Sequence, residues 1–174
     1  GQEIVTRAKV ILHDSEQIVQ LAKQNLDPDA ATIKLGIIPT LGPYLLPHII
    51  PFIKQRFPKL ELFLYEDQTA RIIKKVQDGE LDAIVLALPV GHEGLEEESL
   101  FAEPFMLATP KEHRLASKKT INAKDLTHEN VLLLAEGHCM RDQALDLCGD
   151  IAIQPGSFSA TSLETLRQMV AFGL

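Results

Sequence analysis

The fold of this chain is decided by one stretch, Ile33-Lys34-Leu35-Gly36-Ile37-Ile38-Pro39-Thr40-Leu41-Gly42-Pro43, residues 33–43. Its first six residues are mostly apolar, which predicts a buried strand over 33–38. The Pro and Gly residues of 39–43 predict a loop, and the residues that follow predict a helix over 44–56. A strand, a loop and a helix in this order form the first part of a βαβ unit.

The same order repeats further along the chain. Two more strands are predicted over 60–65 and 83–88, with a helix over 70–77 between them. Strands that alternate with helices predict a parallel sheet of βαβαβ type. Such sheets bind small ligands at the carboxyl ends of their strands, which is where Thr40 and Thr69 fall.

A second lobe is predicted after Gly94, where the pattern changes. Apolar runs predict strands over 105–109 and 131–135, separated by a polar segment that is poor in helix signals. Residues 157–160 predict a last strand, and Thr161-Ser162-Leu163-Glu164 predicts a capping box that opens a helix. We expect a linker helix over 1–26. Lobe I is expected over about 30–89 together with 157–174, and lobe II over about 90–156.

The first 26 residues predict a long helix with an apolar seam. Ile4, Ile11 and Ile18 recur every seven residues, and an apolar residue follows each of them. This heptad pattern favours a linker and dimerisation helix that packs against a second helix. An amphipathic helix docked on its own domain is the alternative interpretation.

Composition and charge narrow the classes of function. The 174 residues are 45% apolar, which is enough for a core, and the formal charge of −7 argues against nucleic-acid binding by this segment itself. There is no apolar run long enough for a membrane span and no signal-peptide pattern, so we expect a cytoplasmic protein that binds no membrane. The scattered histidines and two cysteines predict no metal and no cofactor.

The two cysteines, Cys139 and Cys148, bracket a predicted helix of 140–147. Nine residues along a helix correspond to about 13 Å of rise, whereas a disulfide needs Cα atoms about 6 Å apart. Helix and disulfide therefore exclude each other, and oxidation requires the segment to unwind and repack. The pair predicts a two-state redox element.

The surroundings of the two thiols differ. Cys139 lies at the predicted helix start beside His138 and close to Arg141, which favours the reactive thiolate. Cys148 follows apolar residues and suits a resolving thiol, which condenses with a sulfenic acid. The alternative is that both cysteines are ordinary core residues, and on spacing alone both interpretations stay open.

Three stretches carry a resemblance to the LysR-type transcriptional regulators, and in particular to their peroxide-sensing members: 36–47, 136–144 and 160–167. The specific motif is His-Cys-x-Arg-Asp-Gln, followed by a second cysteine. The resemblance implies an α/β, two-lobed, periplasmic-binding-protein-like effector-binding domain preceded by a linker helix. The family's N-terminal helix-turn-helix domain, which binds DNA, is expected to be absent from this chain.

The resemblance also implies roles for individual residues. Cys139 would be the cysteine that hydrogen peroxide oxidises, and Cys148 the one that then forms an intramolecular disulfide with it. Thr40 and Thr69 would line the peroxide pocket, and the remaining site residues, which would position peroxide or the redox segment, are His138, Arg141 and Asp142.

The implied function is regulation of transcription, not catalysis. Disulfide formation would rearrange a homodimer or homotetramer and so alter DNA binding through the absent domain. The other implied partners are RNA polymerase and a thiol reductant such as glutaredoxin or thioredoxin.

Several alternatives stay open on the sequence alone. Thr40 and Thr69 are suited to capping the helices that follow them, and Arg141 and Asp142 to an exposed ion pair of little energetic value. A LysR-type domain that senses a non-redox small molecule and a thiol peroxidase are the rival functions.

Overall fold

The structure is a computed structural model that describes residues 1–26, 30–92, 94–149 and 154–173. The chain divides into two compact units, Gly1–Glu96 (unit 1) and Glu97–Leu174 (unit 2). Each unit has its own parallel sheet, and each is described separately below.

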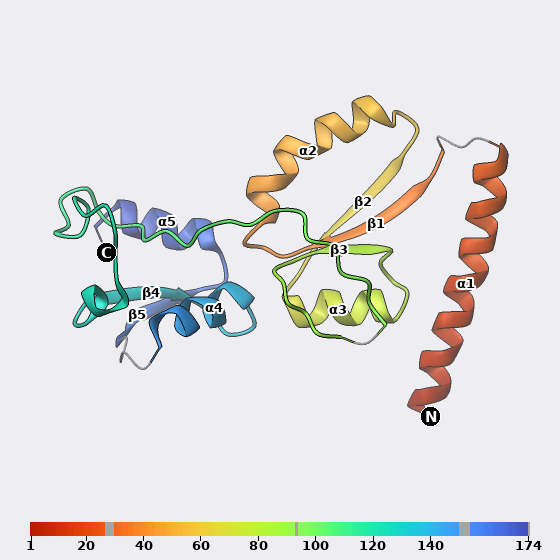
Figure 1. Ribbon diagram of the computed structural model, residues 1–174. Coiled ribbons are helices and arrows are strands. Elements are labelled where there is room, and N and C mark those ends of the chain that lie inside the picture. The colour runs from red at the N-terminus through yellow and green to blue at the C-terminus, as the bar shows by residue number, and fades with distance from the viewer. Residues whose placement is uncertain (27–29, 93, 150–153, 174) are drawn as a thin grey trace. The chain divides into compact units, whose positions relative to one another are not determined.

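Unit 1 contains the predicted βαβαβ sheet. Its strands and helices are β1 (Thr32–Ile37), α2 (Gly42–Arg56), β2 (Glu61–Glu66), α3 (Thr69–Gln77) and β3 (Ala83–Val85). The strands pair in the order β2-β1-β3, all parallel, and α2 and α3 lie on opposite sides of the sheet (Figure 1). Strand β3 ends at Val85 and is therefore shorter than the predicted strand of 83–88.

The core of unit 1 lies between the sheet and α3. Ile37 and Ile72 are completely buried, and Leu81 is 2% exposed. Gly36 permits this close packing, because a Cβ atom there would lie 2.7 Å from Leu81 Cδ1 and 3.0 Å from Ile84 Cγ2. The glycine near the end of β1 is thus required by the contact between strand and core.

Helix α2 begins two residues earlier than predicted and contains three prolines, Pro43, Pro47 and Pro51. Pro43 fits the first turn, where a helix has no use for the missing N–H. The other two lie four residues apart along the helix and are exposed, so water can reach the carbonyl groups that they leave without a donor. This is how α2 continues to Arg56 despite its prolines.

The N-terminal helix α1 (Gln2–Leu26) is formed as predicted. Its seam is not buried in unit 1, since Ile4, Ile11 and Ile18 are each more than 65% exposed. Among the described side chains of α1, one contact with the rest of the unit is polar: Lys9 Nζ donates to Glu80 Oε1 at 2.9 Å. The hydrogen bond and charge of Glu80 raise the pKa of Lys9. The alternative of an apolar face docked on its own domain thus finds no support in the described seam residues.

Unit 2 contains η1 (Ala123–Leu126), β4 (Asn130–Leu134), α4 (Cys139–Cys148), β5 (Gln154–Ala160) and α5 (Leu163–Ala171). Strands β4 and β5 pair in parallel, with an irregularity in register between Val131 and Leu133. Among its described residues, the buried apolar side chains are four leucines, namely Leu115, Leu133, Leu134 and Leu166.

Unit 2 differs from the sequence predictions in three respects. Residues 105–109 form no strand: within the part of the chain that is described no strand lies beside them, and a strand needs such a neighbour. Residues 157–173, expected in lobe I, belong to unit 2, because β5 pairs with β4. The cap of α5 is Ser162, whose Oγ accepts from the N–H of Thr165, and not the predicted box that begins at Thr161.

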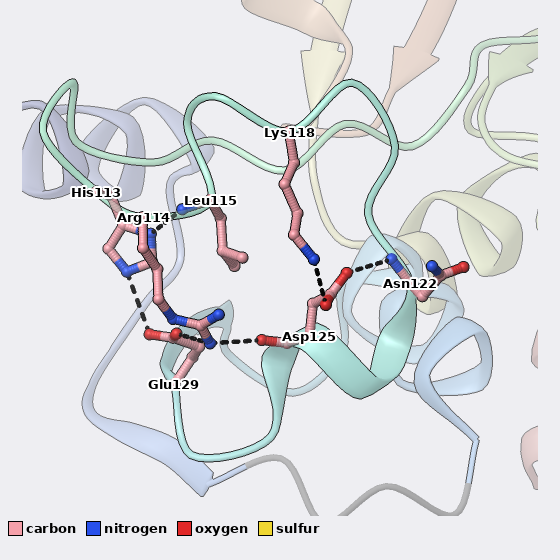
Figure 2. A network of polar contacts seen from close by, with 7 residues as sticks. All are labelled: His113, Arg114, Leu115, Lys118, Asn122, Asp125 and Glu129. Carbon is pink, nitrogen blue, oxygen red and sulfur yellow. Dashed lines mark hydrogen bonds and ion pairs between the residues drawn. The ribbon is translucent and has the colours of Figure 1, made fainter.

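A polar network holds the loop before β4 (Figure 2). Lys118 Nζ donates to Asp125 Oδ1 at 2.6 Å, and the N–H of Asn122 donates to Asp125 Oδ2 at 3.0 Å. Arg114 forms an ion pair with Glu129 and also donates to the Asp125 carbonyl. The hydrogen bond from Lys118, followed by that from Asn122, holds the pKa of Asp125 below its usual value.

The α1 contact predicts unequal effects of two glycine substitutions. Gly79 has φ +72° and Gly91 has φ +64°, so alanine at either position is strained by about 1 kcal/mol. A Cβ on Gly79 would also lie 2.6 Å from His13 Cγ, whereas a Cβ on Gly91 has nothing within 4 Å. We expect Gly79→Ala to lower the free energy of unfolding more than Gly91→Ala, as measured by urea unfolding. Equal losses would mean that His13 does not rest on Gly79.

The network of Figure 2 predicts a pH-dependent effect. Because the folded pKa of Asp125 is lowered, its contribution to stability is present above the unfolded pKa of about 3.9 and is lost as the pH falls through the folded pKa. Asp125→Asn should therefore lower the urea midpoint at pH 7, and the difference from wild type should shrink below pH 4. Glu112→Gln, at an exposed position in the same loop, is the control that should change little at either pH.

Candidate functional site

Thr40 and Thr69 both lie at the carboxyl edge of the unit 1 sheet, as predicted. Thr40 is in the turn after β1, and Thr69 is the first residue of α3, after β2. Neither acts as a helix cap, because the cap residues are Leu41 and Gln68 and neither helix has a side-chain cap bond. Thr69 Oγ1 is buried without a hydrogen-bond partner, which marks it as a group in need of one.

Asp67 is a charged neighbour of Thr69 that the sequence analysis missed. Its Oδ1 accepts from the N–H of Gln68 at 2.9 Å and from Arg71, and its Oδ2 accepts from Lys75. Partial burial raises the pKa of Asp67, but these donors outweigh burial and hold the pKa below its usual value. The available signal was its position directly after a strand and just before the helix.

The segment between the two cysteines of unit 2 is a helix, as predicted. Cys139 is the first residue of α4 and Cys148 the last, and both are free and half-buried. Nine residues of helix place their Cα atoms about 13 Å apart. The described state is therefore the dithiol state, and this helix cannot hold the disulfide without unwinding.

His138 is the most deeply buried polar side chain of the described site residues. It is 3% exposed, and its Nε2 has no hydrogen-bond partner. The residue precedes α4 as its N-cap, but the side chain makes no cap bond. A buried imidazole nitrogen without a partner is costly, so the position is suited to a small ligand with a donor or acceptor.

Arg141 and Asp142 do not form the exposed ion pair that was one alternative. Arg141 Nη1 donates to the backbone carbonyl of Leu134 at 3.0 Å, from a partly buried position. Asp142 is exposed, and no ion pair between these two residues occurs in the described parts of the chain. Arg141 thus connects the first turn of α4 to the end of β4.

Unit 2 brings together five of the seven predicted site residues along α4 and its cap: His138, Cys139, Arg141, Asp142 and Cys148. Thr40 and Thr69 belong to unit 1. The roles predicted for these residues remain predictions.

Three other kinds of feature could indicate a function: a groove, a metal site and a membrane-spanning helix. A groove of about 410 Å³ on unit 1 is lined by α2 residues and Glu66, and it contains none of the predicted site residues. Within the described residues, no group of three His, Cys, Asp or Glu is arranged to hold a metal ion. None of the helices so described is both long and apolar enough to cross a bilayer.

Comparison with known protein sequences gives consistent matches. The model of the LysR substrate binding domain matches residues 26–174. The transcriptional dual regulator OxyR of Escherichia coli K12 is 42% identical over 174 residues, and the hydrogen peroxide-inducible genes activator of Haemophilus influenzae is 38% identical over 172. These alignments cover 99% and 98% of this chain and 57% of each relative, so the chain spans little more than half of their length.

Comparison with solved structures gives matches to the same group of proteins. The reduced form of OxyR has a TM-score of 0.72 and 46% identity, and it aligns with 83% of this chain over 68% of its own. The oxidised form has a TM-score of 0.70 at the same identity, over 82% and 68% of the two chains. A full-length OxyR variant from Pseudomonas aeruginosa has a TM-score of 0.83 and 38% identity, over 99% of this chain and 57% of that one.

The unpartnered imidazole predicts an unusual effect on stability. We expect His138→Leu to raise the free energy of unfolding by about 1 kcal/mol, because it removes a buried polar atom that has no partner. His48→Leu, at an exposed position on α2, is the control and should change it by less than about 0.5 kcal/mol. Urea unfolding of both variants measures the difference. A loss of stability in His138→Leu would show that the imidazole has a structural bonding role.

Proposed function

The chain belongs to the family of LysR substrate-binding domains, and from this premise we propose that it is the redox-sensing regulatory domain of a peroxide-responsive transcriptional regulator. The expected fold class, a two-lobed periplasmic-binding-protein-like α/β domain, is confirmed by the family match and by the solved structures. The observation that carries the proposal is the placement of Cys139 and Cys148 at opposite ends of one helix.

The proposed chemistry has two steps. In the first, the Cys139 thiolate attacks one oxygen of hydrogen peroxide, the O–O bond breaks, and a sulfenic acid and hydroxide form. In the second, the Cys148 sulfur attacks the Cys139 sulfur, which closes a disulfide and releases water. The two cysteines together lose two electrons and the peroxide gains them.

The residues around Cys139 support the first step. Peroxide is small and neutral, so it must be held by a few directed hydrogen bonds. The buried Nε2 of His138, directly before Cys139 in the chain, offers one such bond, and the nearby carboxylate of Asp142 offers another. The resemblance assigns the same role to Thr40 and Thr69 in unit 1, and the unpartnered Oγ1 of Thr69 suits it.

The second step supplies the conformational signal. Because the helix separates the two sulfurs, disulfide closure must unwind α4 and change the surface of unit 2. We propose that this change rearranges a homodimer or homotetramer, to which the exposed seam of α1 contributes, and so alters DNA binding by a separate domain. A reductant such as glutaredoxin or thioredoxin would restore the dithiol.

The remaining parts of the proposal concern the whole protein. We propose a regulator that acts on transcription in the cytoplasm through DNA and RNA polymerase, and not an enzyme. The relatives that this chain resembles are named as a regulator and an activator, which supports a sensing role over turnover of peroxide.

Mass spectrometry after a near-stoichiometric pulse of hydrogen peroxide tests the two cysteine roles. In the wild type we expect the mass to fall by two hydrogens, with the new link mapped to the peptides of Cys139 and Cys148. In Cys148→Ser we expect Cys139 to be trapped as sulfenic or further oxidised acid, and in Cys139→Ser we expect little oxidation.

Slow and unselective oxidation of both thiols would exclude the proposed chemistry. The rival function would then be a domain that binds a non-redox small molecule, and replacing both cysteines by serine would leave that binding intact. Many turnovers of peroxide per thiol in the presence of a reductant would instead indicate a thiol peroxidase.

A further inference from the structure

Helix α4 buries little of its own side-chain surface in unit 2. It has ten residues, and none of its side chains is fully buried. Leu147 near its end is 59% exposed. An isolated helix of this length is marginal in water, so α4 depends on the few contacts that tie it to the rest of unit 2.

The contact that ties its first turn is the hydrogen bond from Arg141 Nη1 to the Leu134 carbonyl, 3.0 Å long. Leu134 ends β4 and is 3% exposed, and the next residue, Ala135, continues the pairing by donating to the Ala160 carbonyl. The acceptor is therefore fixed in the sheet. In the described residues this is the side-chain hydrogen bond that joins α4 to β4.

We infer that Arg141 is a positioning residue that retards the disulfide step by holding the first turn of α4 on β4. This inference rests on the proposed function. Condensation of the Cys139 sulfenic acid with the Cys148 thiol forms the S–S bond and releases water, and it requires α4 to unwind. The attack of the Cys139 thiolate on peroxide requires no unwinding, so only the second step breaks the bond to Leu134.

The opposite role for Arg141 makes a different prediction. An arginine that bound peroxide or the departing hydroxide would accelerate the first step, and its removal would slow the formation of sulfenic acid. The backbone carbonyl of Leu134 already occupies one N–H of the guanidinium in the dithiol state. The two roles therefore differ in which rate constant changes.

The experiment measures the two rate constants separately after rapid mixing with hydrogen peroxide. Sulfenic acid formation is followed in a Cys148→Ser background by trapping with dimedone, and disulfide closure is followed by mass in chains with both cysteines. The variants are Arg141→Met, which removes the charge and the N–H donors, and Arg141→Lys, which keeps the charge and an ammonium group that can donate hydrogen bonds. Arg167→Met on α5, whose arginine pairs with Glu164, is the matched control.

We expect Arg141→Met to accelerate disulfide closure about tenfold, which corresponds to about 1.4 kcal/mol off the barrier. In Arg141→Lys, which keeps the positive charge near the Cys139 thiolate, sulfenic acid formation should stay within about twofold of wild type. Arg141→Lys should recover a large part of the wild-type closure rate, and Arg167→Met should leave both rates unchanged. If Arg141→Met does not fold, Arg141→Lys still tests the inference. Its disulfide should close faster than that of wild type, by a smaller factor than in Arg141→Met.

Other outcomes would overturn the inference. An unchanged or slower closure in both variants would mean that Arg141 does not hold the helix, and a slower sulfenic acid step in Arg141→Lys, which keeps the charge, would mean that Arg141 acts on peroxide. Failure of the wild type itself to form the disulfide would overturn the proposed function, and the inference with it. The behaviour of the wild type thus separates the two failures.

Discussion

The parallel pairing of β1 with two neighbours at once is the constraint on which unit 1 depends. Because β1 pairs with β2 on one side and β3 on the other, the chain must cross from strand to strand through helices on opposite faces. This arrangement puts the ends of β1 and β2 at one edge of the sheet. Thr40 and Thr69 therefore lie at that edge, and the remaining residues of the unit stabilise the sheet.

Unit 2 has a smaller sheet, and this sheet positions the start of helix α4. Two parallel strands and a few leucines hold β4, and β4 in turn holds the start of α4 through the Leu134 carbonyl. His138 lies in the chain between the end of β4 and the start of α4, and its side chain is buried. The helix itself contributes little to the core. The leucines of unit 2 thus stabilise its fold, whereas the proposed reactive cysteines lie on the neighbouring helix α4.

The elements that depend on local patterns were predictable from the sequence, and those that depend on distant partners were not. Periodicity and breakers located α3 and α4 to within a residue or two. The predicted strand of 105–109 failed because strand formation requires a neighbour, which periodicity does not reveal. The bond from Arg141 to Leu134 was also out of reach, because its acceptor is a backbone carbonyl that every residue possesses.

The absence of buried side chains in α4 has a consequence for how such a segment can vary between related proteins. Substitutions at exposed positions usually change stability by less than about 0.5 kcal/mol, whereas substitutions in a core change it by several times that amount. Residues such as Asp146 and Leu147 are therefore open to replacement without damage to the leucine core of unit 2. The residues that would tune the proposed redox switch are thus different from the residues that stabilise the fold, so the first can change during evolution while the second are preserved.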